Sequence, residues 1–347
     1  MTEIPTPLRI VLIGGGSGLS TLLHGLKPYA RAEPAPLADI TAVVTVADDG
    51  GSSGRLRRDF KVLAPGDIRN CLVALSEDEA LLSRLFQYRF ASGHGLKGHS
   101  FGNLFLTALT KVTGDFAQAV KVSSEVLAIA GRIYPSTAAN VALEAVLEDG
   151  RRVLGETRIS KARSRIRRIE LKPARCMPLE ETLGAIAEAD LISFGPGSLF
   201  TSVIPNILVE GIPHAIANSP AVKACFVNLM WQPGETIDFT AADHVTALAE
   251  HAGMNLLDYV VVNTRPVSPA LLEKYERERA RPVENDLERL EGMGVRIVSR
   301  DLLEEGEKIR HNPAASAAVA LELAEEGRKR RAMRNVSVVQ KLEAGSS

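Results

Sequence analysis

The feature that most constrains the fold is an aliphatic run that ends in glycines and passes directly into a helical pattern. The run LRIVLIGGG starts at Leu8 and has the aliphatic, β-branched composition of a buried strand. Apolar residues then recur at helical spacing from Leu19 to Leu26, and Pro28 is expected to end that helix. A buried strand followed at once by an amphipathic helix is typical of a sheet that helices cover.

Strand-like and helical patterns alternate along the rest of the chain. Helices are expected in residues 67–75, 79–90, 101–112, 115–130, 179–189, 240–253, 269–280 and 313–333, and in part of 198–211. Strands are expected in residues 40–47, 190–195, 213–219, 258–263 and 295–299. This alternation predicts an α/β fold: a Rossmann-like, doubly wound, mainly parallel sheet with helices on both faces.

One segment departs from this alternation. Two β-like runs flank Asp149-Gly150, a strong hairpin signal, and the alternation in RIRRIEL fits a further two-faced strand. We expect a small β-hairpin insertion at about residues 140–172, inside a single domain of residues 8–330 that is followed by a tail at 331–347. The basic residues between Arg151 and Lys172 either protect an exposed sheet edge or form an anion-binding arm.

Bulk composition disfavours several classes of protein. With 347 residues, 45% of them hydrophobic, the chain can bury a large core, and a net charge of −1 gives no reason to expect a nucleic-acid partner. Cys71, Cys176 and Cys225 lack metal-binding spacing and suit a reducing compartment. The sequence shows neither a signal peptide nor an apolar run of about 20 residues, so we expect a cytoplasmic protein without a membrane span.

Ligands of a doubly wound sheet bind beyond the carboxyl ends of its strands, where this chain carries several glycine-rich or polar segments. The first is a run of four glycines and one serine: Gly14, Gly15, Gly16, Ser17 and Gly18. Such a run lets backbone N–H groups approach a phosphate at a helix N-terminus. It departs from G-x-G-x-x-G because Leu19 stands at the third glycine position. It is therefore either an anion-binding loop or a tight turn without a ligand.

The second segment, VTVADDGGSSGRL, follows the next predicted strand. Asp48 lies where an acid often binds a ribose, and together with Asp49 it can instead bind Mg²⁺ through water. Asp49 can equally cap a turn. The glycine-serine loop after the acids offers hydroxyls and a guanidinium suited to phosphate, from Ser52, Ser53 and Arg55. Mg²⁺ at Asp48 and Asp49 is the one cofactor that this pattern suggests.

Two further segments place polar groups at the starts of predicted helices. In PGDIRN, Asp67 is either a helix N-cap or a ligand contact, and Arg69 and Asn70 on the first turn can face a ligand. The segment GHSFGN crowds three polar residues at another helix start: His99, Ser100 and Asn103. A histidine between glycines serves either a ligand or a structural hydrogen bond.

A second glycine-rich loop, FGPGSLFTS, follows a later strand. Gly195, Gly197 and Ser198 offer backbone donors at a helix start, as the first loop does. Two such loops on one sheet suggest a ligand with two ends, for example a nucleotide diphosphate joined to another group. The segment NLMWQPGET is interpreted as a turn at Pro233-Gly234.

Taken in order, these motifs resemble the gluconeogenesis factor family, the YvcK-like branch of the CofD-like superfamily. The resemblance extends from about Leu8 to His311 and rests on GGGSGLSTLLHGLK, VTVADDGGSSGRLR, PGDIRN, LFQYRF, GHSFGNL, GPGSLFTSVIPN and QPGET. It implies a cytoplasmic regulator that is needed for growth and cell shape on gluconeogenic carbon sources. Peptidoglycan precursor supply is the process that the resemblance implies it regulates, through protein partners.

The resemblance also implies a ligand and residues that bind it. Members of this branch bind UDP-sugars such as UDP-N-acetylglucosamine, and the matching late residues here are Tyr275 and Arg310. The other branch of the superfamily implies an enzyme that transfers a phospholactyl group from a guanosine diphosphate carrier to a deazaflavin with Mg²⁺. The motif details favour the regulatory branch, so we expect a regulator that binds a UDP-sugar or a related dinucleotide. A homodimer is the default expectation for its assembly.

Overall fold

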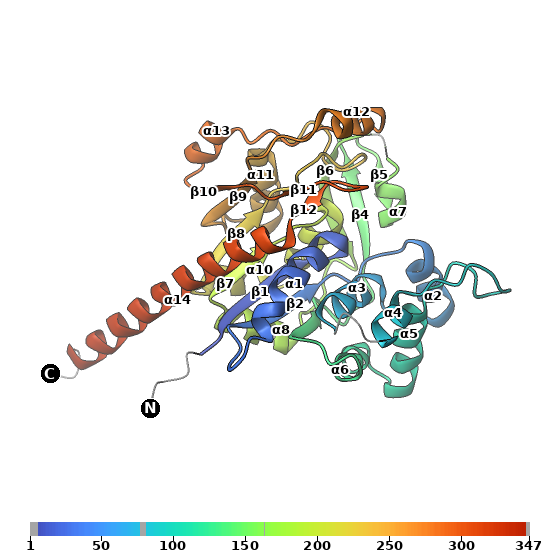
Figure 1. The fold of residues 1–347 in the computed structure, drawn as a ribbon, viewed down its shortest axis with the longest axis horizontal. Coiled ribbons are helices and arrows are strands. Elements are labelled where there is room, and N and C mark those ends of the chain that lie inside the picture. The colour runs from blue at the N-terminus through green and yellow to red at the C-terminus, as the bar shows by residue number, and fades with distance from the viewer. Residues whose placement is uncertain (1–5, 77–80, 163, 345–347) are drawn as a thin grey trace.

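The centre of the molecule is a sheet of seven parallel strands in the order β10-β9-β8-β7-β1-β2-β3 (Figure 1). The computed structural model describes residues 6–76, 81–162 and 164–344, with side chains described as far as residue 334. The strands are β1 Leu8–Gly14, β2 Ala38–Val44, β3 Arg132–Pro135, β7 Leu191–Phe194, β8 Val222–Phe226, β9 Tyr259–Asn263 and β10 Arg296–Arg300.

Strand order reverses beside β1, and this reversal positions the site. The chain adds β2 and β3 on one side of β1, and then returns to add β7, β8, β9 and β10 on the other side. Ile13 of β1 pairs with Phe194 of β7, so the carboxyl ends of these two strands lie next to each other. The segments that follow them begin at the switch point, where open α/β sheets bind ligands.

Helices flank the sheet, as expected from the alternating pattern (Figure 1). The helices of the first half are α1 Gly16–Ala30, α2 Gly51–Phe60, α3 Gly66–Leu75, α4 Leu81–Gln87, α5 Phe101–Thr113 and α6 Phe116–Val126. Those of the second half are α8 Glu180–Glu188, η1 Leu199–Val203, α9 Ile204–Ile207, α10 Ile212–Asn218, α11 Ala241–Ala252, α12 Pro269–Arg277, α13 Leu287–Gly292 and α14 Pro313–Ala344. The α1 helix packs against α3 and α14, whereas α8 packs against α10. The predicted doubly wound α/β fold is confirmed.

The prediction of a strand at residues 213–219 is wrong. These residues belong to helix α10, because Ile212 and Ile216 lie four apart on one buried face and Pro213 occupies the first turn, where its missing N–H costs nothing. The strand of this unit is β8, which sequence reasoning missed. In helix α1, Pro28 does not end the helix, which continues to Ala30.

The predicted hairpin insertion forms a separate three-stranded antiparallel sheet. Its strands are β4 Ala142–Leu147, β5 Arg152–Leu154 and β6 Ile166–Lys172, in the order β5-β4-β6, with the short helix α7 Glu156–Ile159 after β5. Arg152 forms 2.6 Å ion pairs with both Glu144 and Glu170. Because these charges pair across neighbouring strands, the structure favours the role of protecting the sheet over that of an anion-binding arm.

The late part of the chain adds a two-stranded ribbon and a long helix. Strands β11 Leu303–Glu304 and β12 Arg310–His311 pair antiparallel and lead into α14. The α14 helix continues to Ala344, into the segment expected to be a tail, while residues 345–347 lie outside the described part. Within the described ranges no individual helix has the length and apolarity to cross a membrane, although the bent pair Leu199–Ile207 and Ile212–Asn218 meets those criteria jointly.

Candidate functional site

The two glycine loops lie against each other at the switch point. A side chain at Gly18 would come within 2.7 Å of the backbone carbonyl of Pro196, and one at Gly197 would lie 3.2 Å from the carbonyl oxygen of Gly15. Glycine is therefore needed at residue 18 for the close approach of two backbones rather than for an unusual dihedral angle. The loops also share Asn206, whose amide donates to the carbonyl of Gly14 at 3.1 Å.

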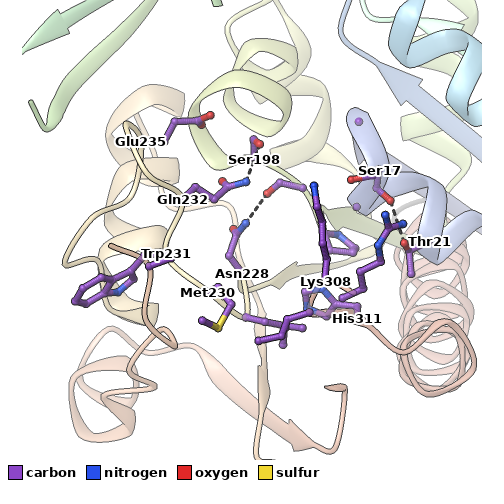
Figure 2. Close-up of a pocket in the computed structure, with 18 of the residues that line it drawn as sticks. Ser17, Thr21, Ser198, Asn228, Met230, Trp231, Gln232, Glu235, Lys308 and His311 are labelled. Atoms are coloured by element: carbon purple, nitrogen blue, oxygen red, sulfur yellow. Dashed lines mark hydrogen bonds between the residues drawn. The ribbon is translucent and has the colours of Figure 1, made fainter. Parts of the chain in front are cut away.

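These loops form one side of a cavity of about 490 Å³ (Figure 2). The lining residues from the loops are Gly15, Gly16, Ser17, Gly18, Pro196, Gly197 and Ser198. A volume of this size lies within the range of small-ligand pockets. The two loops line one cavity, as the sequence suggested. One detail differs, because Ser198 precedes the short π-helix η1 rather than an α-helix.

A second wall of the cavity comes from the segment after β8. Gln232 donates to the hydroxyl of Ser198 at 2.8 Å, and Asn228 donates to the carbonyl of Gly197 at 3.0 Å (Figure 2). Sequence reasoning interpreted this segment as a turn and missed both amides. The signal was present: had β8 been recognised, Asn228 would have been found two residues beyond its carboxyl end.

Glu235 lies at the base of this wall and is almost fully buried. One of its carboxylate oxygens accepts a hydrogen bond from the Thr201 hydroxyl at 3.0 Å, and the other has no partner. Burial raises the pKa of Glu235 to about 7, even though hydrogen bonds from Thr201 and from backbone N–H groups oppose the rise. The carboxyl group is therefore divided between its neutral and charged forms near pH 7.

The third wall comes from residues 274–311 and contains the two residues that the resemblance implied as ligand contacts. Tyr275 and Arg310 line the same cavity as the glycine loops. The hydroxyl of Tyr275 accepts a 2.8 Å hydrogen bond from the backbone N–H of Ile309, which fixes the ring beside the β11–β12 ribbon. Lys274 donates to the carbonyl of Glu307 at 2.6 Å and joins helix α12 to the same ribbon.

The acidic segment differs from its predicted form. The expected glycine-serine loop after Asp49 is the helix α2, which starts at Gly51 and buries Ser52 and Ser53 in its first turn. Asp48 accepts a 2.7 Å hydrogen bond from the N–H of Gly50. The segment is thus the start of a helix whose hydroxyls face inward, and its binding of phosphate stays a prediction.

Asp49 joins the main domain to the insertion. One of its oxygens accepts hydrogen bonds from the backbone N–H and the hydroxyl of Thr157, at 2.9 and 2.8 Å. The described residues contain no group of three or more histidine, cysteine, aspartate or glutamate side chains placed to hold a metal ion. Since Thr157 occupies one oxygen of Asp49, a Mg²⁺ ion at this place would depend on the other oxygen of Asp49 and on Asp48, together with water or ligand oxygens.

The serines at the start of α2 contact the GHSFGN motif at the start of α5, outside the first cavity. The hydroxyl of Ser52 lies 2.9 Å from Nδ1 of His99, and Asn103 donates to the hydroxyl of Ser53 at 3.4 Å. Ser100 caps α5 by accepting from the N–H of Asn103. Burial, followed by nearby arginines, lowers the pKa of His99. The structure thus gives these residues hydrogen-bonding roles that hold α2 against α5.

Arg55 also lies outside the cavity. Its guanidinium donates to the carbonyl of Lys97 at 2.9 Å and ties α2 to the loop before α5. The expected contribution of Arg55 to a phosphate site beside Asp48 therefore has no support in its contacts.

Asp67 is not the N-cap of α3, because the cap position is Pro65 and no side chain caps this helix. Its buried carboxylate lies beneath the first glycine loop: a side chain at Gly15 would overlap it, and the N–H of Gly16 donates to it. Burial, and then the charge of Asp48, raises the pKa of Asp67 to about 7. Burial, and then the charges of Asp48 and Asp67, raise the pKa of Glu156 to about 9.

Arg69 and Asn70 do not line the first cavity. They lie on α3 beside a neighbouring cavity of about 650 Å³, which shares Ser17, Thr21 and Arg310 with the first. Among the predicted site residues, those that line the first cavity are Gly15, Gly16, Ser17, Gly18, Gly197, Ser198, Tyr275 and Arg310, while Arg69 and Asn70 line only its neighbour. The others line neither cavity: Gly14, Asp48, Asp49, Ser52, Ser53, Arg55, Asp67, His99, Ser100, Asn103 and Gly195.

Comparison with known proteins decides the family. A family model described as 2-phospho-L-lactate transferase CofD matches residues 10–303. The chain belongs to the CofD family. The gluconeogenesis factor of Bacillus subtilis is 48% identical over 319 residues, which are 92% of this chain and 98% of that protein. The gluconeogenesis factor of Halalkalibacterium halodurans is 46% identical over 315 residues, 90% of this chain and 96% of that protein.

Solved structures of a CofD-family relative have the same fold. Two crystal structures of a Bacillus halodurans protein superpose with a TM-score of 0.87 each, at 46% and 45% identity. They cover 91% and 92% of this chain and 100% of theirs. The resemblance to the gluconeogenesis factor family of the CofD-like superfamily, stated from the motifs, is confirmed.

Proposed function

We propose that this chain binds a nucleotide sugar of the UDP-N-acetylglucosamine class in the 490 Å³ cavity and acts as a regulator of morphogenesis and growth under gluconeogenic conditions. One observation carries the proposal: two glycine loops from adjacent strands and the late residues Tyr275 and Arg310 line a single cavity. Two relatives are called gluconeogenesis factors, which supports the proposed role in growth under gluconeogenic conditions.

The diphosphate of such a ligand would lie in the cavity against the exposed backbone of both loops, which pack against each other. Glycines at residues 15, 16 and 18 expose backbone at the N-terminus of α1, a 15-residue helix whose dipole favours an anion there. Neutral donors carry much of this recognition, because the cavity is lined by three basic residues and three acidic ones: Lys274, Lys308, Arg310, Glu235, Glu278 and Glu307.

The two ends of the ligand would contact the other walls. Tyr275 offers an aromatic face for the base, and its ring position is fixed by Ile309. Arg310 offers a guanidinium to a phosphate oxygen. On the opposite wall, Asn228, Gln232 and Ser198 form a polar surface suited to sugar hydroxyls (Figure 2).

The description of the matching family model favours a second candidate function. CofD is described as a 2-phospho-L-lactate transferase, so transfer of a phospholactyl group from a guanosine diphosphate carrier to a deazaflavin is the alternative. In that case Asp48 and Asp49 are the residues that would help hold Mg²⁺, which would supply charge stabilisation for the phosphoryl group. The regulator proposal further includes a cytoplasmic location, homodimeric assembly and a protein partner in peptidoglycan precursor synthesis.

Calorimetric titration separates the two functions. UDP-N-acetylglucosamine should give a saturable heat, whereas GDP and a deazaflavin should give none; the opposite pattern would favour the transferase. Removing the Tyr275 ring or the Arg310 charge should weaken UDP-sugar binding by about tenfold or more. Arg167→Ala on the exposed face of β6 is a matched charge control and should bind normally. Unchanged affinity in both Tyr275→Ala and Arg310→Ala would remove the late-chain wall from the site.

A further inference from the structure

The cavity beside the proposed nucleotide site is strongly basic. It has a volume of about 650 Å³, and its ionisable lining residues, apart from two histidines, are three arginines and one glutamate: Arg69, Arg89, Arg310 and Glu304. Counting these groups gives a formal charge of +2. The first cavity, by contrast, has equal numbers of basic and acidic residues. The excess of positive charge at this edge of the sheet therefore lies in the second cavity.

The three guanidiniums come from separate elements, and no salt bridge joins any of them to an acid within the described residues. Arg69 belongs to α3, Arg89 follows α4, and Arg310 belongs to β12. Arg89 donates to the carbonyl of Gly98 at 2.7 Å, which holds its side chain in place. Bringing like charges together costs free energy unless an anion neutralises them.

Arg69 is the best-positioned of these residues. The Arg69 side chain packs against Gly102. A Cβ atom at residue 102 would lie 2.9 Å from Cγ of Arg69, so glycine at this position leaves room for the arginine. One terminal nitrogen donates to the side-chain oxygen of Asn70, and its buried Nε has no hydrogen-bond partner in the described part of the chain. Asp67 and Asp48 attract this guanidinium but form no ion pair with it. Arg69 is thus held in place with fewer acceptors than it can use.

We propose that this second cavity is a separate binding site for a small dianion, either a phosphate monoester or a dicarboxylate. A dianion matches the formal +2 of the lining, and arginines suit both phosphate and carboxylate oxygens. The hydroxyl of Ser17 adds a neutral donor at the boundary with the first cavity, whereas the hydroxyls of Ser20 and Thr21 donate to the backbone carbonyls of Gly16 and Ser17. Because the cavities share Ser17, Thr21 and Arg310, the dianion would lie next to the nucleotide sugar and sense its presence.

The site does not depend on the proposed nucleotide function, since Arg69 and Arg89 line the second cavity alone. The test is calorimetry of the full chain with three probes: glucose 6-phosphate, succinate and inorganic phosphate. At least one of the first two should bind saturably at constant ionic strength. The Arg69→Gln/Arg89→Gln double variant should weaken that binding by about tenfold or more while leaving UDP-N-acetylglucosamine affinity unchanged.

The two organic probes identify the source of the dianion, because a phosphate-ester site prefers glucose 6-phosphate and a dicarboxylate site prefers succinate. Arg89→Gln alone, at an exposed position, keeps the test valid if the buried Arg69 variant unfolds. Arg84→Gln is the matched control: it removes one exposed arginine that lies outside the cavity. Absence of binding by both organic probes, or equal losses in Arg84→Gln and Arg89→Gln, would overturn the proposal.

Discussion

Replacement of Asp67 by asparagine tests the electrostatics beneath the first glycine loop. Asp67 is partly buried, and desolvation of its carboxyl group beneath the glycine loop raises its pKa from 3.8 to about 7. A folded-state pKa above the unfolded value means that the native protein holds a proton which the unfolded chain releases. Stability is therefore greatest below pH 4 on this account, and it falls as the pH rises toward 7.

The size of the effect follows from the two pKa values. Since one pKa unit corresponds to 1.36 kcal/mol, moving a pKa from 3.8 to about 7 corresponds to about 4 kcal/mol at high pH. This is an upper value, because hydrogen bonding rearranges in the variant. An asparagine carries no charge and can still accept from the N–H of Gly16. Asp67→Asn should therefore be more stable than the parent protein at pH 8 by about 1–4 kcal/mol, and by less than half of that amount at pH 5.

Urea denaturation at pH 5, 6, 7 and 8 measures this difference directly. Asp59→Asn, at an exposed position of α2, is the matched control and should show no pH-dependent gain. The reasoning is refuted if Asp67→Asn is destabilised equally at all four pH values, because the carboxylate would then act as a charged partner rather than as a buried acid.

Three other changes test separate parts of the structure. Gly18→Ala places a methyl group 2.7 Å from the backbone of Pro196, so it should destabilise the fold by about 1–3 kcal/mol and weaken UDP-N-acetylglucosamine binding in calorimetry; Gly184→Ala, with open space around it, should do neither. Asp49→Ala removes both hydrogen bonds to Thr157 and should speed amide exchange in residues 156–160, and unchanged exchange would contradict the proposed tether. Between pH 7 and pH 9 the parent protein should lose stability, because Glu156, whose pKa is raised to about 9, still holds a proton that the unfolded chain has released; a rise in stability over that range would contradict this. Below pH 7 the lowered pKa values of His99, His244, His251 and His311 act in the opposite direction.

Much of the fold follows from local sequence patterns. The unit from Leu8 to Ala30 shows a continuous apolar strand, a glycine turn and a helical stripe, and each of these is dictated by nearby residues. The hairpin at Asp149-Gly150 is equally local, since Gly150 adopts the positive φ that its turn requires. Strand β8 was missed because a five-residue run containing Lys223 gives little periodicity, and the preceding Ala-Ile pattern of α10 resembles a strand.

The candidate site divides in the same way. The two glycine loops could be found from sequence because each directly follows an apolar strand. The inward orientation of Ser52 and Ser53 could not, since it depends on α5 packing against α2 from about 50 residues away. The position of Asp67 beneath Gly16 could not be found from sequence either. That contact joins the starts of α1 and α3, which become neighbours only when the sheet forms.

The most direct test of the account is a crystal structure of the protein grown with UDP-N-acetylglucosamine. We expect difference density for a diphosphate in the cavity against residues 15–18 and 196–198, with the remainder of the ligand reaching Tyr275 and Gln232. Ordered ligand density at any other place, with this cavity free of ligand, would contradict the central claim.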